Sequence, residues 1–421
     1  MNDTIRFLDL FAGAGGLSEG FIRAGFSPVA HVEFDKAACY TLKTRVAYHW
    51  LRTHGNIKAY SEYLHGRLSR SELYGMIPDS VIESVINREI GEESLPEIFS
   101  SIDKLLNGEP LDLIIGGPPC QAYSFIGRSR DEKKMHGDKR NYLYIYYAEF
   151  LRKYQPKYFV FENVTGLLSA RSPEGERYFE NMQKLFNEVG YKTEYRILSA
   201  DDYGVPQNRK RIILVGKRGN ETDFYPEPEK WKPGVKVSEV LQDLPSLNAG
   251  NGSIRPCTLL NYNGRYLYEA GIRNDDLPLP VTFHKARPHH PRDLEIYRIA
   301  VATWTHKKER LDYNNLPERL KTHRNRTSFL DRFKVVAADM ECAHTVVAHI
   351  SKDGHFYIHP DISQNRSLTP REAARLQTFP DDYFFESTSE KPGRTSAYKQ
   401  IGNAVPVLLS QKIAEKLKEV W

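Results

Sequence analysis

Four side chains able to do chemistry stand beside apolar runs of this 421-residue chain. Cys120 follows the run LDLII and the turn GGPP, and Glu162 follows the run YFVF. Arg209 and Arg211 stand just before the run IILVG, so an extended chain points both to one face. A thiol can attack carbon, a carboxyl group can supply a proton, and a guanidinium group can hold a carboxylate or polarise a carbonyl oxygen. Together they indicate covalent catalysis with proton transfer.

Each of these residues also has an ordinary structural explanation. A lone cysteine is usually a small buried hydrophobe. A glutamate after a strand, or an arginine beside one, is usually solvated surface charge. Cys120 differs because two prolines, Pro118 and Pro119, stiffen the turn before it. Two glycines, Gly116 and Gly117, let the backbone approach a ligand closely, which favours a nucleophile over a residue that fills the core.

These side chains need a sheet edge to hold them, and the beginning of the chain predicts one. Residues 5–11 form a predicted buried strand, Gly13 to Gly16 a turn, and LSEGFIRAGF a helix that ends at a glycine. PVAHVEFD follows as a second strand and completes a βαβ unit. The pattern predicts an α/β fold with a doubly wound sheet. In such a sheet a nucleoside ligand lies over the glycine turn, and an acid at the position of Glu33 can bond the ribose.

The glycine turn leaves three interpretations open: a site for S-adenosylmethionine (SAM), a site for a nicotinamide dinucleotide, and a turn without a ligand. A dinucleotide site needs the spacing G-x-G-x-x-G. Gly13 and Gly15 fit its first half, but Ser18 occupies the last position, and the turn has no basic residue for a pyrophosphate. The turn therefore favours SAM, which carries an adenosyl group without a pyrophosphate.

The composition is that of a globular protein, with 40% hydrophobic and 27% charged residues and a net charge of +5. The first residues lack the pattern of a signal peptide, and no apolar run is long enough to cross a membrane. The four cysteines form no CxxC pair, and the spacing of His284, His289 and His290 matches no zinc site. We therefore expect a cytoplasmic protein with no disulfide framework and no metal.

Six motifs, in one order along the chain, resemble those of the DNA (cytosine-5) methyltransferase family of bacterial restriction–modification type. They are DLFAGAGGLSEGF (9–21), PPCQAYS (118–124), ENV (162–164), QNRKR (207–211), RSLTPREAARLQTFPDDY (366–383) and QIGNAVPV (400–407). The resemblance implies a SAM-dependent, Rossmann-like catalytic domain with a smaller target-recognition domain. It also implies transfer of a methyl group from SAM to C5 of a cytosine in duplex DNA.

For the catalytic residues the resemblance implies a covalent route. Cys120 attacks C6 of the cytosine, and Glu162 acts as an acid at N3 as charge builds up on the ring. Arg209 holds the carboxylate of Glu162, and Arg211 donates to O2. The target base must first flip out of the duplex. No residue stands out as the base that removes the C5 proton, and a water is a candidate.

For the cofactor the resemblance implies that the first motif cradles the methionine end, Glu33 takes the ribose and Phe34 packs on the adenine. The family usually has a GDI-like step soon after the ribose-binding acid. Here a charged, mostly helical insertion at about 45–105 follows, its role is open, and NREI (87–90) is the best substitute. The expected pocket residues are Phe11, Ala12, Gly13, Gly15, Gly16, Leu17, Glu33, Phe34, Glu89, Ile90, Pro119, Leu143, Asn403 and Val405.

The sheet pattern stops after IILVG, which predicts a second domain. We expect a catalytic domain at 1–220, a target-recognition domain at 221–395 and a return to the catalytic domain at 396–421. Residues 284–334 hold thirteen Lys and Arg against six Asp and Glu, which is typical of a phosphate-binding surface.

The candidate DNA contacts lie in that basic stretch, directly after Cys120, and in residues 123–144, which we expect to close over DNA. They are Gln121, Ser124, Arg128, Arg130, Arg324 and Arg326. The expected partners are double-stranded DNA and a separate restriction endonuclease, and the expected state is a monomer without membrane contact. Two other classes stay open: a methyltransferase that acts on RNA, and a DNA-binding protein without catalysis. Methyl transfer to duplex DNA but not to tRNA would exclude the first class. The intact set of cysteine, glutamate and arginines argues against the second, and full methyl transfer by Cys120→Ser would contradict the covalent mechanism.

Overall fold

The computed structural model of the chain describes residues 4–119, 142–172, 174–274, 276–324 and 326–421. Within these residues seven strands form one sheet in the order β3-β2-β1-β4-β5-β8-β6. Neighbouring strands pair in parallel except β8, which runs antiparallel to β5 and β6. The predicted doubly wound α/β sheet is confirmed. The strands are β1 (Arg6–Leu10), β2 (Ser27–Glu33), β3 (Val85–Asn87), β4 (Leu113–Gly116), β5 (Tyr158–Val164), β6 (Tyr191–Ser199) and β8 (Lys210–Arg218).

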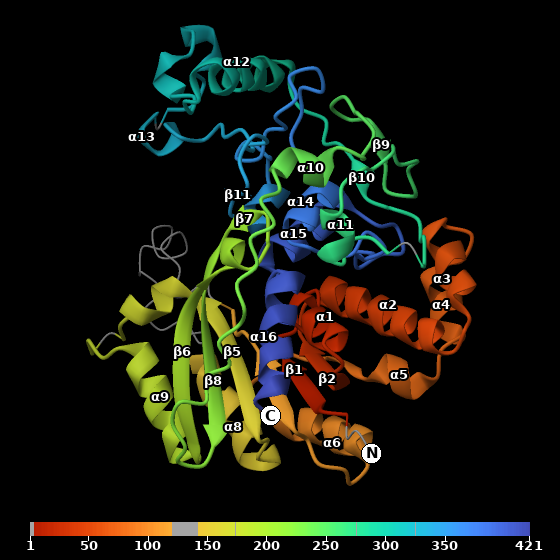
Figure 1. Cartoon of the computed structure of the whole chain (residues 1–421), viewed down its shortest axis with the longest axis vertical. Helices are drawn as coiled ribbons and strands as arrows, with labels where there is room; N and C mark the ends of the chain where they lie inside the picture. The colour runs from red at the N-terminus through yellow and green to blue at the C-terminus, as the bar shows by residue number, and fades with distance from the viewer. Residues whose placement is uncertain (1–3, 120–141, 173, 275, 325) are drawn as a thin grey trace.

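The sheet is buried on both faces, and neighbouring residues of a strand pack to opposite sides. Phe7 of β1 and Ile115 of β4 belong to one hydrophobic cluster, whereas Leu8, Leu10 and Ile114 belong to another. Helices from distant parts of the chain cover the first face, so the C-terminal helix returns to the N-terminal one (Figure 1). These are α1 (Gly16–Arg23) and α16 (Val407–Glu419); the second face is covered by α6 (Leu95–Leu106), α8 (Leu143–Tyr154) and α9 (Tyr178–Glu188).

The strand register brings the predicted site residues to one edge of the sheet. Leu10 of β1 pairs with Gly116 of β4, and Gly116 pairs with Phe161 of β5. Glu33 is the last residue of β2, and Glu162 is the next residue of β5. The glycine turn, Glu33, the turn after β4 and Glu162 therefore lie along the carboxyl edge, where doubly wound sheets bind their ligands.

The chain between β2 and β4 is mainly helical, as predicted for residues 45–105. Two of its elements belong to the sheet layers, since β3 is the edge strand and α6 covers the second face. The others stand beside the β2–β3 end of the sheet (Figure 1). They are α2 (Lys36–Thr53), α3 (Ile57–Leu64), α4 (Arg70–Gly75) and α5 (Asp79–Glu83).

A separate hydrophobic cluster within residues 294–358 forms a lobe above the sheet (Figure 1). The lobe carries α12 (Pro291–Lys307) and α13 (Arg326–Phe329). By contrast α14 (Pro370–Leu376), in the late motif, packs in the cluster on the first face of the sheet, and Pro370 stands in its first turn as the motif suggests. The predicted domain boundaries stay predictions. The remaining elements are α10 (Val237–Leu241), α11 (Tyr266–Glu269), α15 (Arg394–Asn403), the pair β7 (Gln207–Asn208) with β11 (Ala343–His344), and the pair β9 (Gly252–Ser253) with β10 (His284–Lys285).

Candidate active site

Glu162 and Arg211 face each other across strands β5 and β8 at the carboxyl edge. The Nε atom of Arg211 lies 2.7 Å from Oε1 of Glu162, and the two side chains are only 13% and 12% exposed. At these exposures the ion pair is partly shielded from bulk water, so it is screened less than a pair on the open surface. The pair therefore fixes a carboxyl group at the edge where the sheet binds ligands.

The turn after β4 is built against this carboxyl group. A Cβ atom on Gly117 would lie 2.7 Å from Oε2 and 2.9 Å from the carbonyl oxygen of Glu162, so only glycine fits there. Asn163, buried next in the strand, donates from Nδ2 to the carbonyl oxygen of Pro118 at 3.3 Å. The end of β5 is thus joined to the turn that leads to Cys120. Cys120 itself lies outside the described residues.

The partner predicted for Glu162 is wrong, because Arg211 and not Arg209 pairs with it. Arg209 is 2% exposed and donates to the carbonyl oxygens of Val346 and Ala404, each at 2.8 Å. The two arginines diverge because Arg209 lies between β7 and β8 and not within one continuous strand, so the two-residue period does not apply. Arg209 instead joins the segment after β11 to the loop before α16.

Two buried amides extend this junction and were not among the predicted site residues. Gln207 accepts from the backbone N–H of Val346 at 2.9 Å and donates to Oε1 of Gln377 at 2.7 Å. Gln377, in the late motif, donates to the carbonyl oxygen of Ile401 at 2.8 Å. The glutamines of the motif QNRKR and of the late motif were the signals available for this contact.

The backbone after β1 adopts left-handed conformations, with φ of 58° at Phe11, 55° at Gly13 and 80° at Gly15. A left-handed conformation at a residue other than glycine, here Phe11, costs energy, and residues in such conformations cluster at ligand-binding sites. A Cβ atom on Gly13 would meet no described atom within 4 Å. The turn therefore presents backbone to an open space, as a cradle for a ligand would.

Glu33 contacts the glycine turn, and the roles of Glu33 and Phe34 in holding a cofactor stay predictions. Oε2 of Glu33 accepts from the N–H of Gly13 at 2.8 Å, and Oε1 accepts from the N–H groups of Phe34 and Asp35 at 3.0 and 2.8 Å. Burial raises the pKa of Glu33. The ring of Phe34 is 58% exposed, which leaves an aromatic face for a base to stack on.

Asp9 is a buried carboxyl group that sequence reasoning left without a role. It stands opposite His31 of β2, and the hydroxyl of Ser18 donates to it. Burial raises the pKa of Asp9 to about 8. Ser18, the residue that breaks the dinucleotide spacing, therefore serves as the partner of Asp9 beneath the turn.

The stretch NREI follows β3, the strand next to β2. Asn87 donates from Nδ2 to the carbonyl oxygens of Glu33 and Phe34 at 3.1 and 3.0 Å. Glu89 is exposed and Ile90 is buried. Asn87 thus places this stretch beside Glu33, where the resemblance calls for a residue that contacts the adenine. The assignment of Glu89 or Ile90 to that contact stays a prediction.

The loop before α16 closes one side of the turn. A Cβ atom on Gly16 would lie 2.3 Å from the carbonyl oxygen of Val405, so the two backbones are in direct contact. Asn403, at the end of α15, is exposed. The other predicted pocket residues are the buried Ala12 and Leu17 in the turn, and the half-buried Pro119 and Leu143, which border the segment outside the described residues.

Within the described ranges, no group of three or more His, Cys, Asp or Glu side chains could hold a metal ion. His284 lies within hydrogen-bond distance of Thr369 and the carbonyl oxygen of Pro245, and His290 caps α12. These histidines therefore have structural partners. The same part of the chain has no helix of the length and hydrophobicity needed to span a membrane.

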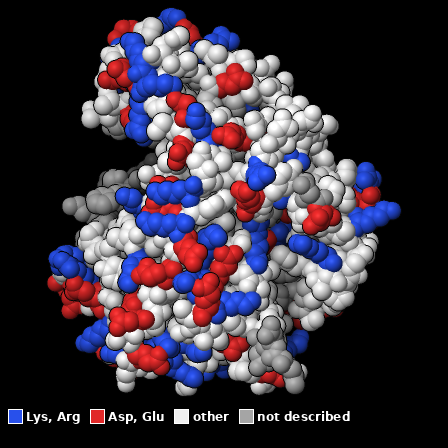
Figure 2. Space-filling view, viewed as in Figure 1, with Lys and Arg blue, Asp and Glu red and all other residues white. Residues whose placement is uncertain are grey.

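Much of the basic stretch that we expect to bind DNA belongs to the lobe. Arg324 and Arg326 are exposed there, and Nη2 of Arg326 lies 3.2 Å from Oε2 of Glu318. Figure 2 shows Lys and Arg side chains along the lobe and a hollow between the lobe and the rest of the molecule. The DNA contacts stay predictions; four of them, Gln121, Ser124, Arg128 and Arg130, lie outside the described residues.

Comparison with known proteins identifies the family of the chain. Residues 5–61 and 87–419 match the C-5 cytosine-specific DNA methylase family. The chain belongs to this family. The resemblance drawn from the six motifs is thereby confirmed, and the protein is a C-5 cytosine-specific DNA methyltransferase. The match leaves out residues 62–86, which lie within the predicted insertion at 45–105.

Relatives of this DNA methylase match it nearly from end to end. The type II methyltransferase M.Bpa9945I of Bacillus paralicheniformis is 41% identical over 451 residues, with 98% of each chain covered. The type II methyltransferase M.DdeI of Desulfomicrobium norvegicum is 29% identical and covers 98% of this chain and 88% of its own. Among solved structures, a putative DNA modification methyltransferase encoded within an E. coli prophage shares the fold, with a TM-score of 0.63, 22% identity and 99% of both chains covered.

Proposed function

We propose that this DNA methylase transfers a methyl group from SAM to C5 of a cytosine flipped out of one short duplex sequence, through a covalent adduct with Cys120. The observation that carries the proposal is the Glu162–Arg211 pair, 2.7 Å apart and set against the turn that leads to Cys120. The enzyme acts in the cytoplasm as a monomer and modifies host DNA in a type II restriction–modification system with a separate endonuclease. The names of its relatives support that role by analogy.

The turn after β1 fits the adenosyl cofactor. Glu33 keeps lone pairs for the ribose hydroxyls, the exposed ring of Phe34 stacks on the adenine, and Glu89 reaches the adenine amine. The open space above Gly13 takes the methionine end, and Val405 closes it from the opposite side. SAM supplies an electrophilic methyl group on a sulfonium centre.

The reaction starts at C6 of the cytosine, where the thiolate of Cys120 forms a carbon–sulfur bond and drives an electron pair toward N3. Glu162 holds a proton at N3, and Arg211 orients its carboxyl group. C5 is then nucleophilic and forms the new carbon–carbon bond with the methyl group, while the bond from this methyl group to the sulfonium sulfur breaks and its electron pair stays on the sulfur of the departing S-adenosylhomocysteine. Loss of the C5 proton, with a water as the candidate base, expels Cys120 as thiolate and restores the aromatic ring.

Transfer of tritiated methyl groups from SAM to unmethylated plasmid DNA and to tRNA tests this proposal. We expect label in the 5-methylcytosine of duplex DNA and none in tRNA. Label in tRNA alone would make RNA the substrate. No label in either, from folded protein that binds DNA, would favour a binding protein without catalysis.

A further inference from the structure

Glu386 is a buried carboxyl group at a meeting point of three helices. Thr44 of α2 and Tyr63 of α3 donate to its Oε1 atom, and Nη1 of Arg70 in α4 lies 3.5 Å from Oε2. The carbonyl oxygen of Glu386 accepts from the side-chain amide of Gln400 in α15 at 2.8 Å. The stretch that follows the late motif is therefore fixed from both sides.

Tyr383, three residues earlier, reaches the cofactor turn. Its hydroxyl donates to the carbonyl oxygen of Ala14 at 2.5 Å. A Cβ atom on Gly15 would lie 2.9 Å from that hydroxyl and 2.8 Å from a methyl group of Leu42 in α2. The turn is thus held between the late motif and α2.

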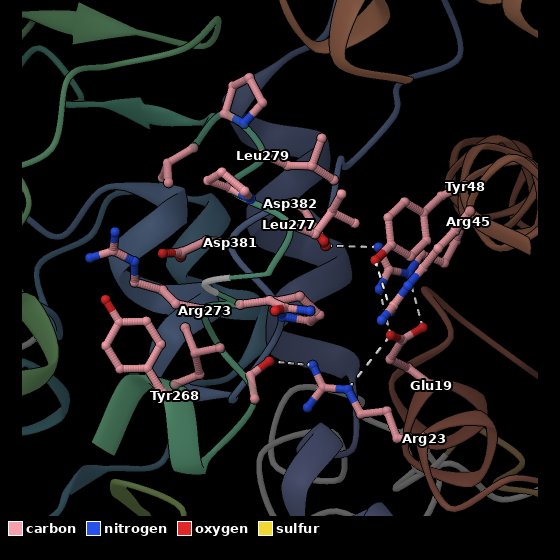
Figure 3. A pocket seen from close by; sticks show the side chains of 18 of the residues that line it. Glu19, Arg23, Arg45, Tyr48, Tyr268, Arg273, Leu277, Leu279, Asp381 and Asp382 are labelled. Atoms are coloured by element: carbon pink, nitrogen blue, oxygen red, sulfur yellow. Dashed lines mark hydrogen bonds and ion pairs between the residues drawn. The ribbon is translucent and has the colours of Figure 1, made fainter. Parts of the chain in front are cut away.

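Arg45 of α2 links α1 and the late motif through ion pairs (Figure 3). It donates to both carboxylate oxygens of Glu19 in α1, and its Nη1 lies 2.8 Å from Oδ1 of Asp382. Its guanidinium carbon lies 4.7 Å from the ring centre of Tyr383. This network lies beside an open pocket of about 860 Å³. Because Arg45 is paired with both Glu19 and Asp382, these charges hold α2 against α1 and against the late motif.

Residues 62–86, which the family match leaves out, supply part of this support. Besides its contact with Glu386, Arg70 donates to the carbonyl oxygen of Ser387 at 2.9 Å. Its guanidinium carbon lies 3.7 Å from the ring centre of Tyr40 in α2. The segment therefore ties α2 to the stretch that directly follows the late motif. The turn itself is held by α2 and by Tyr383 of the late motif.

We propose that residues 62–86 are a brace for the cofactor site, in which Arg70 holds Glu386 and Tyr383 carries the restraint to Ala14. The inference rests on the proposed use of SAM. Arg70 and Tyr383 are positioning residues, because they act through the turn. A turn fixed in advance loses less conformational entropy when its ligand binds, so the brace raises the affinity for SAM.

Tyr383→Phe tests the brace because it removes only the hydroxyl that bonds Ala14. We expect the Kd and KM for SAM to rise about three- to tenfold, the usual effect of one hydrogen bond. The kcat at saturating SAM should change by less than about twofold. Arg70→Ala should raise both constants in the same direction, and Arg70→Lys should restore part of the loss. Titration calorimetry gives Kd, and tritiated methyl transfer into plasmid DNA gives KM and kcat.

Two matched variants separate positioning from a general loss of stability. Tyr191→Phe removes an equally buried hydroxyl, which donates to the carbonyl oxygen of Pro156 at 2.8 Å at the opposite edge of the sheet. Arg67→Ala breaks an exposed ion pair with Glu62 in the same segment as Arg70. Both variants should keep the wild-type Kd for SAM.

An unchanged Kd for SAM in folded Tyr383→Phe would overturn the brace, and so would an equal rise in Tyr191→Phe. If Arg70→Ala does not fold, Tyr383→Phe still decides the question, because it keeps the aromatic ring in place. Wild-type protein that fails to bind SAM would overturn the proposed function itself, which is a different result from variants that bind as well as the wild type.

Discussion

The carboxyl group of Glu162 is held by Arg211, whose Nε atom lies 2.7 Å from Oε1. Glu162 belongs to β5 and Arg211 to β8, so two paired strands and not a loop set their separation. The backbone of Gly117 lies against the same carboxyl group. The sheet therefore positions the proposed acid, Glu162, and the turn that leads to Cys120 before DNA binds.

Glu162→Gln should lower kcat for methyl transfer by about 10²- to 10⁴-fold, the usual contribution of a general acid. The amide keeps the size of the side chain but cannot deliver a proton to N3. Tritiated methyl transfer at saturating SAM measures the effect. Glu180→Gln, at an exposed ion pair with Arg177 on α9, is the matched control and should stay fully active. Wild-type kcat in Glu162→Gln would contradict the role of the acid.

Arg209→Ala and Arg211→Ala should fail in different ways. Arg209→Ala leaves the carbonyl oxygens of Val346 and Ala404 without this donor, so the free energy of unfolding should fall by about 2–4 kcal/mol. Arg211→Ala should lower the free energy of unfolding by less than about 1 kcal/mol, because its ion pair with Glu162 is partly exposed. The same variant should lose most of its methyl-transfer activity. Urea denaturation and methyl transfer check both. Equal losses of stability in the two variants would contradict the structural role of Arg209 and the catalytic role proposed for Arg211.

Asn163→Ala should misplace the turn before Cys120, because it removes the bond from Nδ2 to the carbonyl oxygen of Pro118. We expect kcat to fall about ten- to a hundredfold, as for other small displacements of reacting groups. The Kd for SAM should not change. Asn181→Ala, which removes an exposed bond to Glu176, serves as the control. An Asn163→Ala enzyme with wild-type kcat would show that the turn holds its shape without this bond.

The pH dependence of stability should report on Asp9, whose pKa burial raises from 3.8 to about 8. Between these values the unfolded chain releases its proton while the folded protein keeps it. The stability that neutral Asp9 contributes is therefore full below about pH 4 and is lost as the pH rises toward 8. Asp9→Asn cannot titrate but still accepts from Ser18. Its Tm relative to wild type should rise from about pH 5 to about pH 8 in calorimetry, and a constant difference would contradict the raised pKa.

Phe34→Ala should weaken the binding of SAM without weakening the fold. The ring is 58% exposed, so its removal opens no cavity in the core. Loss of its stacking on the adenine should raise the Kd for SAM about tenfold. Phe34→Tyr keeps the aromatic face and should bind as wild type does. If calorimetry gives the same Kd for all three proteins, Phe34 does not belong to the cofactor site.

The parts of the fold that depend on nearby residues could be predicted from the sequence. The apolar runs give the buried strands, and Gly13 and Gly15 give the turn after β1. Glu33 follows at the end of β2 because one helix and one strand separate it from the turn. Pro370 marks the first turn of α14. Each of these features depends on residues of the same element or of the elements next to it along the chain.

The contacts that hold the site together could not be predicted in this way. The pairing of Glu162 with Arg211 depends on the break between β7 and β8, which the alternation of residues does not show. The hydroxyl of Tyr383 bonds a residue 369 positions away in the chain. Partners so distant leave no local pattern, because tertiary packing alone brings them together.

Bisulfite sequencing of plasmid DNA tests the central claim most directly, with cells that express the wild-type protein beside cells that express Cys120→Ser. The account predicts protected cytosines at one position of one short sequence with the wild type, and none with the variant. Equal protection with Cys120→Ser would contradict the covalent mechanism. No protected cytosine with folded, SAM-binding wild-type protein would contradict sequence-specific methylation of DNA.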